Sequence, residues 1–167
     1  RQMCIRDRAD YRLVEVLRDM GARVIEGDGF VEVSEASLAG VYVDLRDSPD
    51  LLPIVSVLAA VAEGETRIKG VTHARFKESD RIHALAVELA KASIHVEETS
   101  DGLTIRPGKL VKARLDPRGD HRLFMAFALL SLATGGLIEV LGPESASVSY
   151  PNFMDDLKLL GCEVEIS

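Results

Sequence analysis

One stretch, Leu17-Arg18-Asp19-Met20-Gly21-Ala22-Arg23-Val24, decides the fold, because similar stretches return at residues 89–96 and 157–164. Each contains the apolar end of a helix, a turn and the first residues of a strand. A second pair also matches, because Val61-Ala62-Glu63-Gly64 and Leu132-Ala133-Thr134-Gly135 each precede a strand. The copies are about 70 residues apart, which is too long for a short-repeat solenoid and indicates repeated modules that each hold a small sheet.

The pattern within one period predicts the elements of such a module. We expect helices at residues 11–20 and 50–62, a hairpin with strands at 23–26 and 30–33, and further strands at 41–43, 65–71, 137–141 and 163–166. In cyclic order these elements form a βαβαββ module. The expected fold class is therefore α/β (α+β), with about two and a third modules in residues 9–167. The chain would begin inside one module and stop inside another.

The composition is typical of a soluble globular domain, with 47% hydrophobic, 28% charged and 5% aromatic residues in a chain of 167. No apolar run is long enough to span a membrane, and the N-terminus lacks the apolar core of a signal peptide. Cys4 and Cys162 have no disulfide or metal-ligand spacing, so we expect a cytoplasmic location. The net charge of −7 argues against nucleic-acid binding. An anionic ligand would have to be held by a few local cations.

The first eight residues, Arg1-Gln2-Met3-Cys4-Ile5-Arg6-Asp7-Arg8, have no apolar period. Their Met-Cys-Ile-Arg-Asp run resembles a translated sequencing-adapter end fused to an open reading frame. We therefore expect residues 1–8 to be non-native and exclude them from the fold prediction.

The segment Lys77-Glu78-Ser79-Asp80-Arg81 opens a helix, because apolar residues follow it at helical spacing. We expect Ser79 to be the N-cap, since its hydroxyl can accept a hydrogen bond from the helix backbone. Arg81 is then unusual, because a cation in the first turn faces the positive end of the helix dipole. Either an anion is bound nearby, or the segment is a solvated charged cap that contains an arginine.

The segment Asp120-His121-Arg122 repeats this anomaly before a second apolar helix. Arg81 and Arg122 together would form a clamp for a carboxylate or phosphate, because guanidinium groups match both in a bidentate way. Asp50 lies about one period before Asp120, so equivalent module ends would carry the functional groups. A single acid at a helix start is nevertheless more commonly a partner of the helix dipole.

Acid–base groups accompany this expected anion clamp. Glu78 and Asp50 supply two carboxylates, and Lys77 supplies an ammonium group. His121 could titrate near neutral pH, although a single histidine is more often an ordinary surface or cap residue. The remaining histidines show no pattern that predicts a metal site.

A fourth segment, Ser149-Tyr150-Pro151-Asn152-Phe153, leads into another helix, with Ser149 as the expected N-cap. Together with Pro49-Asp50 and the segments at residues 77–81 and 120–122, it makes residues 11–167 resemble the 5-enolpyruvylshikimate-3-phosphate synthase family. The resemblance implies two similar domains, each an inside-out α/β barrel of three βαβαββ modules. It implies transfer of the enolpyruvyl group of phosphoenolpyruvate to the 5-hydroxyl of shikimate 3-phosphate, with release of phosphate and no metal or cofactor.

The resemblance also implies roles for the site residues. Asp50 would bind and help to deprotonate the acceptor hydroxyl, and Glu78 would act as acid and base at the phosphoenolpyruvate methylene. Lys77 would contact the shikimate side and assist proton transfer. The groups that would bind phosphoenolpyruvate are Arg81 and Arg122, with His121 beside them.

Two departures from the family pattern bear on activity. Val148 stands where the family commonly has a lysine that supports the charge of the leaving phosphate. The family's N-terminal domain, which supplies further cations, is not in this chain, so we expect the chain alone to be inactive and the full-length parent to be a monomer. Two other readings stay open: a relative of UDP-N-acetylglucosamine enolpyruvyl transferase, and a noncatalytic binding module that retains the fold.

Overall fold

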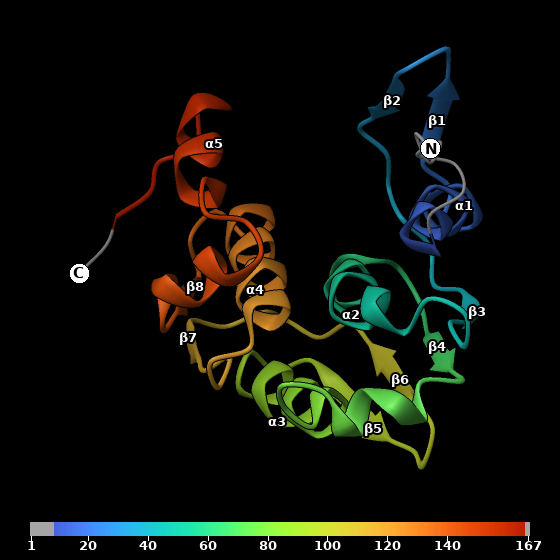
Figure 1. Cartoon of the computed structure of the whole chain (residues 1–167). Coiled ribbons are helices and arrows are strands. Elements are labelled where there is room, and N and C mark those ends of the chain that lie inside the picture. Colours follow the sequence, from blue (N-terminus) through green and yellow to red (C-terminus); the bar gives the residue numbers. More distant parts are fainter. Residues whose placement is uncertain (1–8, 166–167) are drawn as a thin grey trace.

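A computed structural model describes residues 9–165, and these residues alternate between short strands and longer helices (Figure 1). The predicted non-native residues 1–8 lie outside the described residues. In chain order the elements are α1 (Arg12–Asp19), β1 (Arg23–Glu26), β2 (Val31–Ser34), β3 (Tyr42–Asp44), α2 (Leu52–Val61), β4 (Thr66–Lys69), α3 (Arg81–Lys91), β5 (His95–Glu98), β6 (Leu103–Arg106), β7 (Ala113–Leu115), α4 (His121–Ala133), β8 (Ile138–Val140) and α5 (Phe153–Leu159). Short 3-10 helices at Ala9–Tyr11, Pro49–Leu51, Thr72–Phe76 and Pro143–Val148 complete them.

The central part of the chain forms one four-stranded sheet in the order β3-β4-β6-β5. Strands β3 and β4 are parallel and are joined through α2, whereas β6 pairs antiparallel with both β4 and β5. A parallel pair needs such a helical crossover, because a tight turn cannot return the chain to the same end of the sheet. The six elements from β3 to β6 therefore follow the predicted βαβαββ order.

The two ends of the chain contain parts of the same pattern. At the N-terminal end, α1 is followed by the antiparallel hairpin β1–β2. At the C-terminal end, β7 and β8 are parallel and joined through α4, and α5 follows. The hairpin and α5 lie on opposite sides of the molecule (Figure 1). None of the helices in residues 9–165 combines the length and the apolar character that a membrane span requires.

The core is built around α2 and α4, which pack against each other (Figure 1). Helix α2 is buried along most of its length, and its fully buried Ala59 and Ala60 allow a close approach of neighbouring backbones. Helix α4 contributes Leu123 and Phe127, which are both inaccessible to solvent. Because α3 also contacts α2, the N-terminal ends of these three helices are held in fixed relation to one another.

The predicted strand at residues 163–166 is wrong for the part that is described, because residues 162–165 are in no strand. Within the described chain, these residues pair with no other strand, and an extended segment becomes a strand only through such pairing. Val164 instead lines a cavity of about 620 Å³ that Val140 of β8 also lines. In the central module the corresponding space, between β4 and β5, is filled by strand β6.

The predicted helix start at Ser149 is also wrong. Ser149 closes the 3-10 helix Pro143–Val148, and its backbone N–H donates to the carbonyl of Ala146. Helix α5 begins four residues later, with Asn152 at the N-cap position. The proline at position 151 is compatible with the turn between them, since proline has no backbone N–H to satisfy.

Candidate active site

Three helix N-termini meet at the site. Asp50 lies in the 3-10 helix that leads from β3 into α2, and Asp120 is the N-cap of α4, which follows β7. These two acids therefore occupy equivalent places after the first strand of two successive modules. Arg81 is the first residue of α3, which follows β4. The repeat thus explains why residues far apart in sequence come together.

Arg81 is the centre of the network and is almost completely buried, with 1% of its surface exposed. Its Nε donates to Oδ2 of Asp120 at 2.8 Å, its Nη1 to Oδ1 of Asp50 at 2.9 Å, and its Nη2 to Oε2 of Glu78 at 2.6 Å. Burial opposes the charged form, but the hydrogen bonds and charges of Asp120, Glu78 and Asp50 outweigh it and raise the pKa of Arg81. Arg81 is therefore a permanent buried cation.

The two explanations expected for an arginine at the start of α3 were a bound anion and a solvated cap. The structure gives a third answer, because carboxylates of the protein itself surround Arg81. Asp120 lies 39 residues away in sequence. A pairing over such a separation depends on the packing of both α3 and α4 against α2, which local sequence spacing does not encode.

Asp120 is fully buried and organises two of the helix starts. Its Oδ1 accepts the backbone N–H groups of Arg122 at 2.9 Å and of Leu123 at 3.3 Å, which caps α4. Its Oδ2 accepts from Arg81 and from the hydroxyl of Ser79 at 3.1 Å. Burial raises the pKa of this carboxyl, but the hydrogen bond and charge of Arg81 and the two backbone donors hold it below its usual value. Asp120 is ionised at neutral pH.

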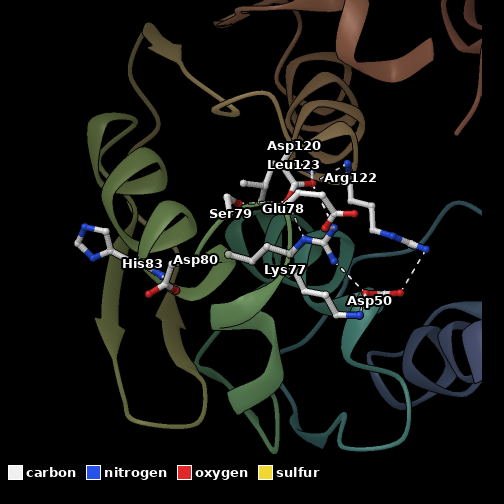
Figure 2. A network of polar contacts seen from close by, with 10 residues as sticks. Asp50, Lys77, Glu78, Ser79, Asp80, His83, Asp120, Arg122 and Leu123 are labelled. Carbon is white, nitrogen blue, oxygen red and sulfur yellow. Dashed lines mark hydrogen bonds and ion pairs between the residues drawn. The ribbon is translucent and has the colours of Figure 1, made fainter. Parts of the chain in front are cut away.

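Ser79 is not the N-cap of α3, contrary to the prediction. Asp80 takes that position, and its Oδ1 accepts the backbone N–H of His83 at 3.0 Å. Ser79 points instead toward Asp120 (Figure 2). The sequence contained a signal for both caps, since aspartate is as good an N-cap as serine. The capping role of Asp120 at α4 was not predicted, although aspartate is a common N-cap.

Asp50 connects the buried arginine to the solvent-facing cations. Its Oδ1 lies 3.5 Å from Nζ of Lys77, and its Oδ2 lies 3.4 Å from Nη2 of Arg122 (Figure 2). Burial is the largest single influence on its pKa and raises it, but the charges of Arg122, Lys77 and Arg81 together hold the pKa below its usual value. Asp50 is thus an ionised carboxylate in contact with three cations.

The network has a buried side and an exposed side. Arg81 and Asp120 form the buried side, whereas the side chains of Lys77, Glu78 and Arg122 are 37%, 48% and 34% exposed. Such an arrangement can hold polar groups of a ligand at the exposed side while the buried pair fixes the geometry. The charges cancel in this network, because three cations face the carboxylates of Asp50, Glu78 and Asp120.

The two other residues that the sequence singled out for the site are His121 and Val148. His121 is in the first turn of α4 and is buried, with 8% of its surface exposed. Val148 is 72% exposed at the end of the 3-10 helix that follows β8. Lys77 directly follows the corresponding 3-10 helix after β4. In the described part of the chain, no cluster of His, Cys, Asp and Glu side chains is arranged to hold a metal ion.

Comparison with known proteins identifies the family of the chain that carries this network. The family described as EPSP synthase (3-phosphoshikimate 1-carboxyvinyltransferase) matches residues 4–157 of the chain. The chain belongs to the EPSP synthase family. Curated relatives named 3-phosphoshikimate 1-carboxyvinyltransferase include those of Methanopyrus kandleri, 48% identical over 93% of this chain, and Methanocella arvoryzae, 44% identical over 94%.

Solved structures of EPSP synthases support the same assignment. The EPSP synthase of Acinetobacter baumannii superposes on 93% of this chain with a TM-score of 0.75 and 26% identity. The enolpyruvyl transferase NikO of Streptomyces tendae, at 21% identity and a TM-score of 0.69, shares the fold. The chain spans 36% and 38% of the Methanopyrus and Methanocella relatives and 40% of the Acinetobacter chain. It therefore corresponds to part of an EPSP synthase.

Proposed function

We propose that this chain supplies one side of the active site of a 3-phosphoshikimate 1-carboxyvinyltransferase. The reaction transfers the enolpyruvyl group of phosphoenolpyruvate to the 5-hydroxyl of shikimate 3-phosphate and releases phosphate. The observation that carries the proposal is the single network of Asp50, Lys77, Glu78, Arg81 and Arg122, in a chain of the EPSP synthase family.

The acid–base chemistry is assigned to the exposed side of the network. Addition begins when the methylene carbon of phosphoenolpyruvate gains a proton and its neighbouring carbon is attacked by the 5-hydroxyl. Glu78, once protonated, delivers a proton to the methylene carbon and later removes one from the resulting methyl group, and Asp50 binds the hydroxyl and accepts its proton. Lys77, 3.5 Å from Asp50, stabilises the negative charge there and assists this transfer. Elimination of phosphate then restores the double bond.

The arginines are assigned to anion binding. Arg81 and Arg122 both contact Asp50 and would hold the carboxylate and phosphate of phosphoenolpyruvate, with His121 beside them in the first turn of α4. In the ligand-free chain Glu78 occupies Nη2 of Arg81. A substrate carboxylate that takes this position displaces Glu78, whose freed carboxylate then takes up from solvent the proton that it delivers to the methylene carbon.

The rest of the site is assigned to the part of the protein outside this chain. Because the charges of the network cancel, two anionic substrates require further cations. We propose that an N-terminal domain supplies them, that the complete protein has two domains built as inside-out α/β barrels, and that it is a monomer. Val148 removes one expected cation, so release of phosphate should be slower than in a relative with lysine at this position.

A chimeric enzyme tests the proposal. Residues 9–167 would replace the matched C-terminal part of the Methanopyrus kandleri relative, and phosphate release would be measured with phosphoenolpyruvate and shikimate 3-phosphate. We expect release that needs both substrates, and its loss in an Asp50→Asn variant of the chimera. A chimera that folds, with a cooperative unfolding transition, but releases no phosphate would contradict the proposal and favour a noncatalytic module.

A further inference from the structure

Helix α3 carries a second buried charge besides Arg81. Glu88 lies seven residues after Arg81, and Leu85 lies between them on the same face of the helix. Glu88 is 2% exposed and Leu85 is fully buried. A buried carboxylate is stable only when polar groups surround it, so its partners indicate what it does. The catalytic scheme above makes no use of Glu88.

The partners of Glu88 lie mainly in the loop between β7 and α4. Its Oε2 accepts the backbone N–H of Asp116 at 2.9 Å, and its Oε1 lies 3.7 Å from Nη2 of Arg118. Lys91, one turn further along α3, contacts the same carboxylate at 2.5 Å. Glu88 therefore holds both a backbone and a side-chain group of the loop that leads into α4.

This loop has an unfavourable backbone conformation. Arg118 has a φ of 55° and Gly119 a φ of 75°, so two consecutive residues are left-handed. Glycine adopts this conformation freely, whereas a residue with a Cβ does not. Asp116 accepts the backbone N–H of Arg118 at 2.8 Å, and the N–H of Asp120 donates to the carbonyl of Pro117 at 2.9 Å. Contacts on both sides of Arg118 are thus needed to keep the turn.

The two charges of α3 hold the two ends of one loop. Arg81 binds Asp120, where the loop ends, and Glu88 binds Asp116, where it begins. Helix α3 also packs against β7, which precedes the loop. The position of Asp120 decides where it caps α4, and therefore where the first turn of α4 places Arg122.

We propose that Glu88 is a positioning residue for the anion-binding side of the site. It fixes the left-handed turn at residues 116–119, and through this turn the place of Asp120 relative to Arg81 and Arg122. The part concerning catalysis rests on the function proposed above. The alternative is that Glu88 only forms an intrahelical ion pair with Lys91 and contributes to stability without affecting α4.

Amide hydrogen exchange of the chain, resolved by NMR, separates these alternatives. Glu88→Ala removes all contacts with the loop, and Glu88→Gln keeps an oxygen acceptor while removing the charge. We expect exchange at Asp116, Arg122 and Leu123 to become about tenfold faster in Glu88→Ala and less so in Glu88→Gln, because the loop opens locally. The matched control is Glu97→Gln, which removes an exposed ion pair with Arg106.

Two outcomes of the exchange experiment would overturn the proposal. Faster exchange at Asp116 alone, with Arg122 and Leu123 as in the unchanged chain, would show that Glu88 acts only locally. A uniform increase at all amides would show a general loss of stability. If Glu88→Ala does not fold, the same comparison is made between Glu88→Gln and Glu97→Gln.

Kinetics of the chimeric enzyme test the catalytic part. We expect Glu88→Gln to raise the KM for phosphoenolpyruvate about tenfold and to leave the KM for shikimate 3-phosphate within about twofold, since displacement of an anion-binding group weakens one substrate selectively. Equal changes in both constants, or none, would contradict the positioning role. An inactive parent chimera would contradict the proposed function alone, because the exchange result does not depend on turnover.

Discussion

Replacing Asp120 by asparagine removes one charge from the buried side of the network while changing its shape very little. Asparagine can still cap α4, because it is as good an N-cap as aspartate. Arg81 keeps Asp50 and Glu78 but loses the carboxylate that accepts its Nε. Removing one partner of a buried ion pair costs about 3 to 5 kcal/mol. Since two carboxylates remain, we expect the free energy of unfolding to decrease by an amount at the lower end of this range, about 3 kcal/mol.

A comparison of variants separates the charge from the cap. Asp120→Ala removes both, so we expect it to cost about 1 kcal/mol more than Asp120→Asn. The exposed Asp155, which lies 3.8 Å from Lys158 in α5, supplies the control. Because that pair is on the surface, Asp155→Asn should cost less than about 0.5 kcal/mol.

Urea unfolding at neutral pH, followed by far-UV circular dichroism, measures these differences. The midpoint should shift while the dependence on urea concentration stays constant, because the surface exposed on unfolding does not change. A loss below about 1 kcal/mol for Asp120→Asn, or a loss equal to that of Asp155→Asn, would refute the argument. It would mean that Asp50 and Glu78 alone satisfy the buried Arg81.

Three further predictions concern charge. The pKa values of Asp50 and Asp120 are held below the usual value of 3.8, so both carboxylates stabilise the folded chain fully above that pH and lose this contribution as the pH falls through their folded pKa values. Urea midpoints should therefore decrease as the pH is lowered below 3.8, and should decrease less in Asp120→Asn. Arg46→Gln should raise the pKa of Asp44 from about 2 toward 3.8, because the hydrogen bond from the Arg46 side chain is the main cause of the low pKa. An unchanged NMR titration of the Asp44 carboxyl group would contradict this. In the chimeric enzyme Val148→Lys should raise kcat by about tenfold, and an unchanged kcat would show that position 148 does not contact the leaving phosphate.

The sequence predicted those parts of the fold that depend on neighbouring residues. The apolar period and Gly21 placed the end of α1, and Gly27-Asp28-Gly29 placed the β1–β2 turn. The strand predicted at residues 163–166 is not formed by the described residues 163–165, because an extended segment becomes a strand only when it has a partner. The caps of α3 and α5 were each misplaced, since several adjacent residues there can serve as caps.

The site shows the same division between local and long-range information. Arg81 was recognised because its position in a helix conflicts with the helix dipole. Its buried partner Asp120 was not recognised as such, since the two meet only when α3 and α4 both pack against α2. Glu88 carried no sequence signal, because an acidic residue in a helix is usually exposed and only its burial reveals a task.

The chain has a net charge of −7, and its site has no excess of positive charge either. Within this chain each cation of the site already faces a carboxylate, so the site cannot act as a simple basic pocket. An anionic substrate has to replace Glu78 at Arg81 and gain further cations from elsewhere. Binding of phosphoenolpyruvate is thereby linked to release of Glu78, the residue proposed to transfer protons at its methylene carbon. This link favours reaction only when both substrates and the rest of the protein are assembled, because Glu78 is otherwise held by Arg81.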